Sequence, residues 1–294
     1  MASVDLKDAY YSVPIHEDYQ KYLKFQWEDQ LYTFNCLPNG LCVAPRKFTK
    51  LLKPCFAELR TLGHTSVAYL DDSLLISDSW EECMKNIHDT TNLLESLGFC
   101  VNYEKSVLQP TQQITFLGFR INSAHMTISL TEDRKLSVKS EVQKLVQQNK
   151  ASIEQVARVI GKLVACFPAV THGPLFYRKL DIAKNSALRQ SKGNYKATMS
   201  IGEEEKLELT WWLDNLDMAS NPILPRKVDL HISTDASLKG WGACCEDVNT
   251  GGRWNVEESN EHINCLELMA AFLALQSFES RIKGKNVLVY YIFQ

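Results

Sequence analysis

The sequence predicts an α+β fold in which antiparallel hairpins and amphipathic helices follow one another. Hairpins are indicated by pairs of short apolar runs on either side of turn residues. Helices are indicated by apolar residues that recur every three or four positions. With 294 residues, the chain is long enough for two domains, each with a core of its own.

The first 130 residues are expected to form a mostly antiparallel sheet with helices. A helix begins near Pro45, which is favourable in a first turn, and Pro54 is expected to kink it. A second helix has Leu94 and Leu97 on its apolar face and ends at Gly98. In chain order, the expected elements are a strand that ends at Asp5, a hairpin over 24–34, a helix over 45–60, a hairpin over 67–76, a helix over 80–97, and strands near 99–103, 114–121 and 126–130.

The middle of the chain is predicted to be helical. Thr131 and Ser152 are suitable N-caps, because a side-chain hydroxyl accepts a hydrogen bond from the unpaired N–H groups of a first turn. Trp211 and Trp212 are expected to pack within the helices rather than to stack on bases. The expected helices lie near 132–148, 153–166, 174–190 and 202–217. The segment 220–227, with Pro222 and Pro225, is the expected linker.

Beyond this linker the pattern changes to short strands followed by one long apolar helix. Strands are expected near 228–235, 240–246 and 252–255, a helix near 262–280, and a last strand near 286–293. The adjacent Cys244 and Cys245 are expected to alternate between the two faces of a strand rather than to bond each other. This arrangement predicts a second, smaller domain.

The charge is distributed unevenly, although the net charge is only −3. Residues 131–198 hold 13 Lys or Arg and 5 Asp or Glu, an excess of +8, while the remainder, with 19 against 30, carries −11. A basic middle beside acidic ends fits a segment that follows phosphates next to a segment that binds metal. For any single residue, a lysine or arginine that merely solvates a helix is an equally good explanation.

The cysteines and apolar runs narrow the class of protein. Nine cysteines are scattered without a Cys-x-x-Cys pair, so neither a zinc site nor a disulfide framework is expected. Reduced thiols fit a cytoplasmic or nuclear location. No apolar run is long enough to span a membrane, and the acids Asp5 and Asp8 interrupt any signal-like start.

The most informative residues are the adjacent Asp71 and Asp72 at the tip of the 67–76 hairpin. Two neighbouring carboxylates are costly to bury unless a cation neutralises them, and Mg²⁺ prefers such oxygen ligands. A strand that delivers Asp5 to the same place would supply acids from two strands, as two-ion phosphoryl transfer requires. Asp5 and Asp71 would then share two Mg²⁺ ions, with Asp72 in support and Mn²⁺ as an alternative metal. The other interpretation is three unrelated surface acids.

Several segments resemble, in chain order, the motifs of the reverse transcriptase palm: Asp5–Tyr11, Leu37–Gly40, Tyr69–Asp72, Leu97–Phe99 with Lys105, and Phe116–Phe119. The last of these looks like the primer-grip hairpin of the family. The resemblance covers roughly the first 125 residues. It continues into a helical thumb, where two segments are similar to DIRS-like and related retrotransposons: Ile160–Leu163 and Phe167–Ala169. Two later segments resemble the start of a ribonuclease H domain: Ser233–Ser237 and Leu266–Leu268.

The resemblance implies three domains. A polymerase palm with partial fingers, built as an antiparallel sheet with helices on one face, would occupy residues 1–130. A helical thumb or connection would occupy residues 131–219. A truncated ribonuclease H-like α/β domain would occupy residues 228–294.

The resemblance also implies roles for residues around the acids. Tyr10 would lie beneath the incoming sugar, where its ring collides with a ribose 2′-hydroxyl and so favours deoxynucleotides. Asn39 and Gly40 would lie against template and nucleotide, and Lys105 near the leaving pyrophosphate. The alternatives are a core tyrosine, an ordinary Asn-Gly turn and a solvated lysine.

In the ribonuclease H-like domain, Asp235 and Glu267 match two Mg²⁺ ligands of the family. The family places a third acid at the end of the next strand, and the segment 286–294 contains no acid. Two carboxylates hold two metals poorly. This site is therefore expected to be degenerate, with little or no cleavage of an RNA strand.

The resemblance thus implies an RNA-directed DNA polymerase of a retrotransposon that acts in DNA integration or transposition. It would extend a primer 3′-hydroxyl on an RNA template, with a DNA primer or RNA–DNA hybrid and dNTP as partners and no membrane. Because the family's fingers region is not present before Asp5, a fragment of reduced activity is expected. The alternatives are an inactive nucleic-acid-binding remnant of a retroelement and a decaying product without a specific role.

Overall fold

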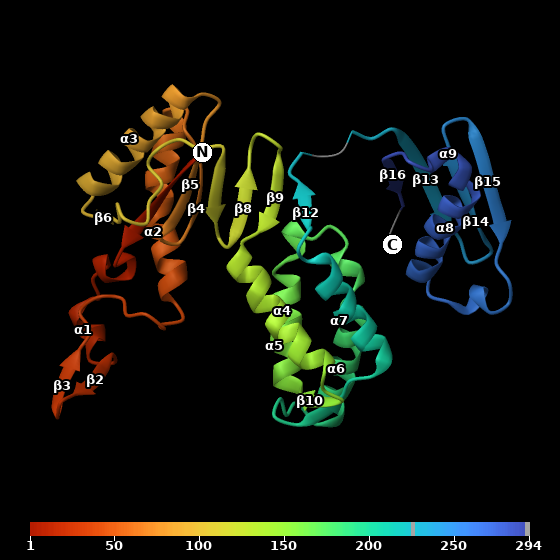
Figure 1. Cartoon of the computed structure of the whole chain (residues 1–294), viewed down its shortest axis with the longest axis horizontal. Helices are drawn as coiled ribbons and strands as arrows, with labels where there is room; N and C mark the ends of the chain where they lie inside the picture. The colour runs from red at the N-terminus through yellow and green to blue at the C-terminus, as the bar shows by residue number, and fades with distance from the viewer. Residues whose placement is uncertain (225–226, 292–294) are drawn as a thin grey trace. The chain divides into compact units, whose positions relative to one another are not determined.

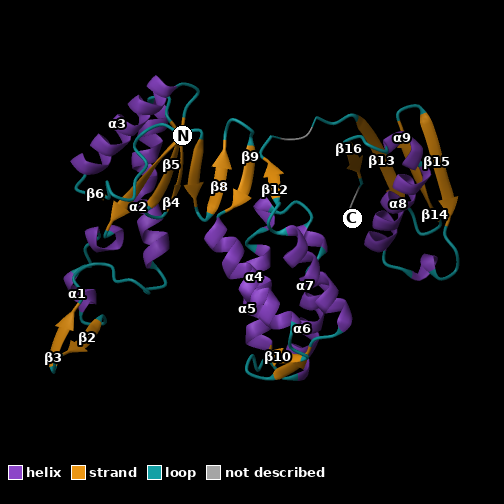
Figure 2. Ribbon diagram, viewed as in Figure 1, coloured by secondary structure: helices purple, strands orange, loops and turns teal. Residues whose placement is uncertain are grey.

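The computed structural model describes residues 1–224 and 227–291 and divides the chain into two compact units, Met1–Ile223 and Leu224–Gln294. Figure 1 follows the chain through both units, and Figure 2 separates helices from strands. Sheets and helices alternate along the first unit, and the second unit combines one sheet with one long helix. The predicted α+β class is therefore confirmed.

The first sheet has the strand order β4-β5-β1-β6, and all its neighbours are antiparallel. Its strands are β1 (Ala2–Lys7), β4 (Thr65–Tyr69), β5 (Asp72–Ile76) and β6 (Cys100–Val101). Tyr69 pairs with Asp72, so Leu70 and Asp71 alone close the β4–β5 hairpin. Because β1 runs antiparallel to β5 with Asp5 opposite Asp72, the later part of β1 and the tip of this hairpin meet at one end of the sheet.

Helices α2 (Ala44–Thr61) and α3 (Trp80–Ser96) cover one face of this sheet. On β1, Val4 and Leu6 are buried in one core with Phe48 of α2 and Leu94 of α3. Side chains alternate along a strand, so Asp5 points to the opposite face. The helices therefore supply the core and leave the acid on the other side of the sheet.

The sequence signals for these helices mostly hold. Pro45 lies in the first turn of α2, and Pro54 lies inside the helix. Ser79 caps α3 by accepting a hydrogen bond from the Glu82 N–H at 3.2 Å. Leu97 is 54% exposed, which corrects its predicted place on the buried face, because α3 ends one residue earlier and the chain turns there.

A second sheet has the order β12-β9-β8-β7. Its strands are β7 (Gln113–Phe116), β8 (Phe119–Asn122), β9 (Thr127–Leu130) and β12 (Ser220–Pro222). The apolar pattern predicts one strand over 114–121 within the first sheet, whereas the resemblance of Phe116–Phe119 implies a hairpin there. The chain reverses at Leu117 and Gly118, whose φ angles are 50° and 77°, so the hairpin is confirmed and the single strand is wrong. A two-residue turn with both φ angles positive is favoured in hairpins. Pro222, placed in the linker from sequence, pairs with Thr127.

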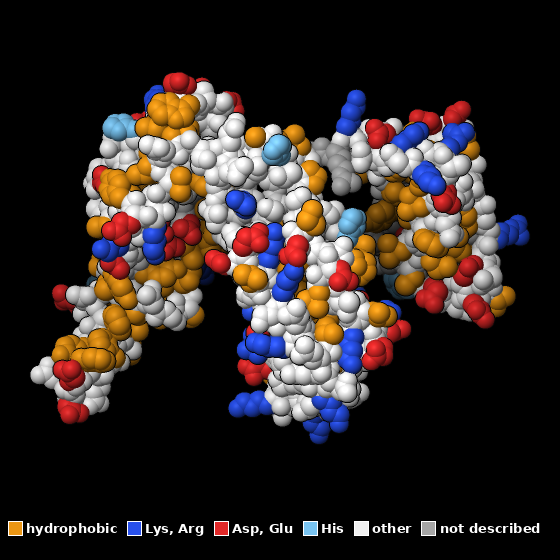
Figure 3. Space-filling view, viewed as in Figure 1, with side chains coloured by type: hydrophobic (Ala, Val, Ile, Leu, Met, Phe, Trp, Pro, Cys, Tyr) orange, Lys and Arg blue, Asp and Glu red, His pale blue; other side chains and the backbone are white. Residues whose placement is uncertain are grey.

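A small hairpin extends from the first unit. It consists of β2 (Lys24–Trp27) and β3 (Gln30–Thr33), preceded by the short helix α1 (Glu17–Gln20). Its loop has two residues, Glu28 and Asp29, both with positive φ. Trp27 and Leu31 are 63% and 68% exposed, and hydrophobic side chains cover this hairpin in Figure 3.

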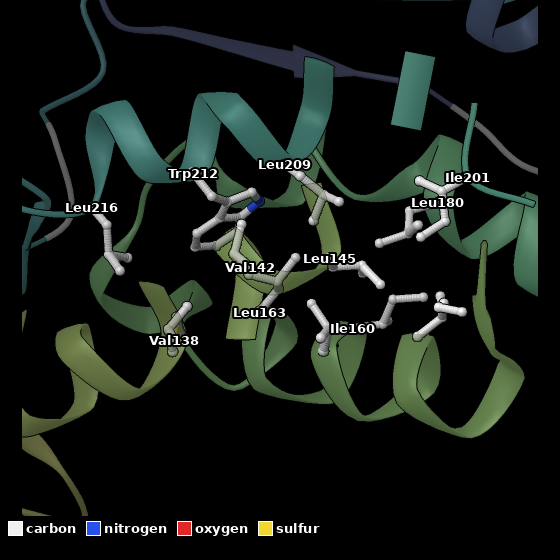
Figure 4. Close-up of a cluster of buried hydrophobic side chains, with 14 of the residues drawn as sticks. Val138, Val142, Leu145, Ile160, Leu163, Leu180, Ile201, Leu209, Trp212 and Leu216 are labelled. Carbon is white, nitrogen blue, oxygen red and sulfur yellow. The ribbon is translucent and has the colours of Figure 1, made fainter. Parts of the chain in front are cut away.

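The rest of the first unit is a helical bundle with its own core. It contains α4 (Glu132–Val146), α5 (Ile153–Val164), α6 (Arg178–Gln190), α7 (Glu203–Asn215) and a small sheet of β10 (Lys150–Ser152) and β11 (Thr198–Ser200). Figure 4 shows Val142, Leu163 and Leu209 pointing into this core. Trp212 is buried there and donates a hydrogen bond to the Phe176 carbonyl at 2.8 Å. Trp211 stacks on the Phe176 ring at 4.0 Å, so both indoles pack as predicted.

The second unit has the strand order β15-β14-β13-β16. Its elements are β13 (Leu230–Ala236), β14 (Gly240–Cys245), β15 (Val248–Arg253), α8 (Ile263–Ser277), α9 (Glu279–Ile282) and β16 (Val287–Tyr290). The pairing of β13 with β16 is parallel and the other pairings are antiparallel. Ala274 of α8 packs with Ile232 and Cys245 of the sheet. Pro225 and the predicted strand residues 292 and 293 lie outside the described residues.

Candidate functional site

The candidate site begins with a pair of carboxyl groups on neighbouring strands. Asp5 of β1 lies directly opposite Asp72 of β5 in the antiparallel pairing. Residues directly opposite each other project to the same face, so the two side chains lie next to each other. The structure thus brings together acids that are 67 positions apart in the sequence.

The electrostatics of the pair follow from this geometry. The pKa of Asp72 is raised from 3.8 to about 6, first by burial, then by a hydrogen bond with Asp5 and by the charges of Asp71 and Asp5. The positive charge of Lys105 acts in the opposite direction. Carboxyl groups this close favour sharing one proton over carrying two charges. Asp5, Asp71, Asp72 and Lys105 are therefore electrostatic neighbours.

Hydrogen bonds donated by three backbone N–H groups fix the strand around Asp5 and the turn at Asp71. The Asp5 N–H donates to the Ser106 hydroxyl at 3.0 Å, and the Asn102 N–H donates to the Asp5 carbonyl at 2.8 Å. The Leu6 N–H donates to the Asp71 carbonyl at 3.0 Å. Sequence reasoning missed Asn102 and Ser106, because a loop asparagine and serine carry no pattern that links them to a strand about 100 positions earlier.

The tip of the β4–β5 hairpin is strained. Leu70 has a φ of 56°, a left-handed conformation that is unfavourable for a bulky L-residue. Asp71 follows it in the turn and is exposed. Strain of this kind persists only where the surrounding structure enforces it, and it is concentrated at functional sites.

Tyr10 lies beside these acids. Its ring packs edge-on against Phe48, with centroids 5.5 Å apart. Burial raises the pKa of the Tyr10 hydroxyl, and the nearby Asp71 and Tyr69 raise it further. The Tyr10 ring thus lies beside the acids and also packs on the core through Phe48. Its role as a sugar gate stays a prediction.

The loop with Asn39 and Gly40 lies next to the segment that carries Tyr10 and Tyr11. The Asn39 amide donates to the Tyr11 hydroxyl at 3.3 Å. Gly40 has a φ of 87°, and no heavy atom lies within 4 Å of the position a Cβ would take. The glycine is therefore required by the backbone conformation of the turn, and the space beside it is open. Contacts of this loop with template or nucleotide stay predictions.

The acids provide hard oxygen donors, which suit Mg²⁺ or Mn²⁺. The direct pair is Asp5 with Asp72, while Asp71 occupies the turn. Among the described residues, no group of three or more His, Cys, Asp or Glu is arranged to hold a metal ion. The donor chemistry fits the predicted metal, and the sharing of ions by Asp5 and Asp71 stays a prediction.

The second unit brings Asp235 and Glu267 together. Burial raises the pKa of Glu267, a backbone hydrogen bond from Ala236 lowers it, and the charge of Asp235 raises it again. Glu267 is only 1% exposed, and its Oε2 atom has no hydrogen-bond partner among the described residues. The two predicted acids are thus neighbours, and a buried carboxylate oxygen remains to be neutralised.

No helix within residues 1–224 and 227–291 is both long and apolar enough to cross a bilayer.

Residues 1–121 match the family model described as reverse transcriptase (RNA-dependent DNA polymerase). The chain is 32% identical over 136 residues to the Gag-Pol polyprotein of avian reticuloendotheliosis virus, which covers 43% of this chain and 12% of the polyprotein. It is 26% identical over 211 residues to Protein P of duck hepatitis B virus (strain China), which covers 68% of this chain and 26% of that protein. The chain thus spans a small part of these relatives' length.

Solved structures share the fold over nearly the whole chain. A foamy viral protease-reverse transcriptase in complex with an RNA/DNA hybrid superposes with a TM-score of 0.61 at 18% identity, covering 98% of this chain and 38% of that one. A second structure of this protein, in complex with double-stranded DNA, gives a TM-score of 0.63 at 19% identity, covering 98% and 49%. These likenesses establish the arrangement of strands and helices.

Proposed function

We propose that this chain, whose residues 1–121 match the reverse transcriptase family model, is an RNA-directed DNA polymerase of a retrotransposon that acts in its transposition. The observation that supports this best is the pairing of Asp5 with Asp72 beside Asp71. Carboxylates from two strands are what nucleotidyl transfer onto a primer 3′-hydroxyl requires. By analogy with the foamy viral protein, the partners are an RNA/DNA hybrid or a DNA duplex, together with an RNA template and dNTP.

Each residue of the site has a task in this proposal. Two bound Mg²⁺ ions would activate the attacking hydroxyl and stabilise the leaving pyrophosphate. Asp5, Asp71 and Asp72 would hold those ions. Tyr10 would exclude a ribose by limiting the space beside the acids. Lys105, exposed and within electrostatic reach of Asp72, would offset negative charge at the leaving group.

Activity is proposed to be low, and ribonuclease H activity lower still. In the first unit, burial raises the pKa of Asp72 to about 6, which opposes metal binding by this carboxyl group below that pH. In the second unit, the described residues provide two neighbouring acids, Asp235 and Glu267, and no third one. A reducing compartment, cytoplasm or nucleus, is part of the same proposal, because the cysteines of the described chain are unpaired.

Primer extension on an RNA template with Mg²⁺ tests the proposal. Asp71→Asn and Asp72→Asn are expected to lower dNTP incorporation by at least about 100-fold, because each removes a charge that holds metal. Asp78→Asn is the matched control, since Asp78 is an exposed acid just after β5 and should leave incorporation unchanged. Equal incorporation by all four proteins would refute the assignment of the site.

The runner-up is a nucleic-acid-binding remnant without catalysis. The absence of a three-acid metal group among the described residues favours it. It predicts no incorporation by the wild type in Mg²⁺ or Mn²⁺, together with binding of a primer–template duplex that weakens as salt rises. Wild-type incorporation that is lost in Asp71→Asn would exclude it.

A further inference from the structure

The basic character of the helical bundle is largely neutralised within the bundle itself. Residues 131–219 hold 14 Lys or Arg against 11 Asp or Glu, because residues 199–219 add six acids, five of them in α7, and one lysine. Many of its cations also have carboxylate partners. The lysines and arginine of 131–198 that form ion pairs are Lys135, Lys139, Lys144, Arg158, Lys179 and Lys184. The net excess is only +3 over 89 residues.

Helix α2 is the contrasting case. Its 18 residues carry five cations and one acid, Glu58, a net +4. All five cations are exposed, and none of them has an ion pair or a side-chain hydrogen bond among the described residues. The cations are Arg46, Lys47, Lys50, Lys53 and Arg60. The density of unpaired positive charge on α2 therefore exceeds that of the bundle.

Four of these cations form a row along the helix. At 100° per residue, Arg46, Lys50, Lys53 and Arg60 fall within an arc of about 80°, and the row is about 21 Å long. The buried residues of α2, including Phe48 and Leu52, lie on the other side of the helix. We call these four residues the α2 cation row.

The row is separate from the acidic site. Helix α2 covers the face of the first sheet that carries Val4 and Leu6, whereas Asp5 points to the opposite face. Lys53 and Arg60 share a cavity with Leu70, which precedes Asp71, but the cation that acts on Asp72 is Lys105 and not a residue of the row. The row is therefore not part of the charge balance of the acids.

An apolar cavity of about 190 Å³ adjoins the row, between α2 and the edge strand β4. Lys53 and Arg60 line it, together with Thr49. Its apolar lining is formed by Leu52, Phe56, Ala68 and Leu70. Cations beside an apolar hollow suit a ligand that carries both phosphates and flat apolar rings.

We propose that the α2 cation row and its cavity bind single-stranded nucleic acid, with the cations on successive phosphates and a base in the cavity. The charges of the row are spaced by four, three and seven residues, about one to two helical turns, which sets them along a line that a phosphodiester chain can follow. An acidic peptide would bring carboxylates but no flat rings for the cavity. This goes beyond the proposed function, because it requires neither the acids nor the metal.

Binding of a fluorescein-labelled 12-nucleotide oligo(U) to the full chain tests the proposal by anisotropy at several NaCl concentrations. The triple variant Lys50→Glu, Lys53→Glu, Arg60→Glu is expected to bind at least about tenfold more weakly. Its slope of log K against log[salt] should be smaller by about 2, at about 0.7 for each lost phosphate contact. The Gln triple variant of the same positions should show a smaller loss in the same direction.

The matched control reverses three exposed cations of the second unit: Lys239→Glu, Lys283→Glu, Lys285→Glu. It makes the same change in net charge and should bind oligo(U) as the wild type does. Equal losses in both triple variants, or no loss in the α2 variant, would overturn the proposal. So would displacement of oligo(U) by polyglutamate of equal charge, which would identify an acidic-peptide surface.

The same proteins separate this inference from the proposed function. The α2 triple variant should extend a primer as the wild type does, because none of its residues contacts the acids. Asp71→Asn should bind oligo(U) as the wild type does. If none of the proteins extends a primer but the α2 triple variant still binds oligo(U) more weakly than the wild type, the proposed function is refuted and the proposal for the α2 cation row is not.

Discussion

At the scale of single residues, the pairing of Asp5 with Asp72 has a thermodynamic cost. The pKa of Asp72 is raised from 3.8 to about 6, first by burial. Between these values the folded chain holds a proton that the unfolded chain releases. Without metal, the free energy of unfolding therefore falls as the pH rises from about 4 to 6 and stays lower above it.

This cost leads to a prediction for Asp72→Asn. The variant cannot ionise, so in EDTA at pH 7 its free energy of unfolding should exceed that of the wild type by about 1 kcal/mol, after allowance for solvent screening. The difference should shrink at pH 4.5. Urea unfolding at both pH values measures it.

Asp78→Asn serves as the control for this measurement, with an expected change within about 0.5 kcal/mol. A variant Asp72→Asn that is less stable than the wild type at pH 7 would contradict the raised pKa. If Asp72→Asn is more stable than the wild type but incorporates less dNTP, the charge of Asp72 lowers the free energy of unfolding and is needed for activity.

The single-residue chemistry is also where the sequence is most informative. Adjacent acids between two apolar runs predict the hairpin tip, and the structure places Asp5, Tyr10 and Lys105 around it. The partners Asn102 and Ser106 could not be predicted, because contacts between a loop and a distant strand depend on the tertiary fold and leave no local pattern.

At the scale of elements, Arg134 connects the β7–β8 hairpin to the helical bundle. Its guanidinium donates to the Leu117 carbonyl at 3.2 Å and to the Ala165 carbonyl at 2.8 Å. It also lies 4.5 Å from the centre of the Phe119 ring. One side chain thus joins the turn of the hairpin, the first turn of α4 and the end of α5.

Arg134→Met is therefore expected to loosen the hairpin and to lower the free energy of unfolding by about 1–3 kcal/mol. Amide hydrogen exchange should become faster in β7 and β8. Lys135→Met is the control, because Lys135 bonds Glu132 and the Asp217 carbonyl but does not touch the hairpin. Equal exchange in the two variants would contradict this role.

The elements themselves are predicted well where the signal is local. Helices with caps and an apolar stripe, such as α3 and α5, lie close to their expected bounds. The β7–β8 reversal follows from the resemblance of Phe116–Phe119 to a hairpin but not from the local pattern, because Leu117 takes a conformation that leucine rarely adopts. The strand β12 was missed because Pro222 suggests a linker, although a proline is tolerated on an edge strand.

At the scale of the whole molecule, the two units have separate cores. The core clusters around Leu163 and Leu75 belong to the first unit, and those around Ile232 and Leu266 belong to the second. None of these clusters of described residues combines residues of both units. The units are therefore expected to unfold separately.

Calorimetry of the full chain should then show at least two transitions, since the first unit holds two core clusters of its own. Ala274→Asp buries a carboxylate in the second unit and should remove one transition, while Ala169→Asp should remove that of the helical bundle and leave that of the second unit. A single transition in the wild type, or loss of all transitions in Ala274→Asp, would show that the units unfold together.

The net charge of the helical bundle can be counted only once the fold shows which helices belong to it. The sequence window 131–198 suggests a strongly basic bundle, but the acids of α7 lie in the same bundle and form ion pairs with it, as Glu204 does with Lys179. Charge counted along the sequence therefore overstates the field of the bundle. The charge that remains unpaired on α2 is the better guide to a polyanion partner.

The register of β1 against β5 has a consequence for how this chain can vary. A slip of β1 by one residue against β5 would turn the side chain of Asp5 into the apolar layer under α2, while Asp72 kept its place. A slip of two residues would restore the face but displace the acid by about 7 Å along the strand. Changes that shift this register would therefore separate the two carboxyl groups, even where both aspartates are kept.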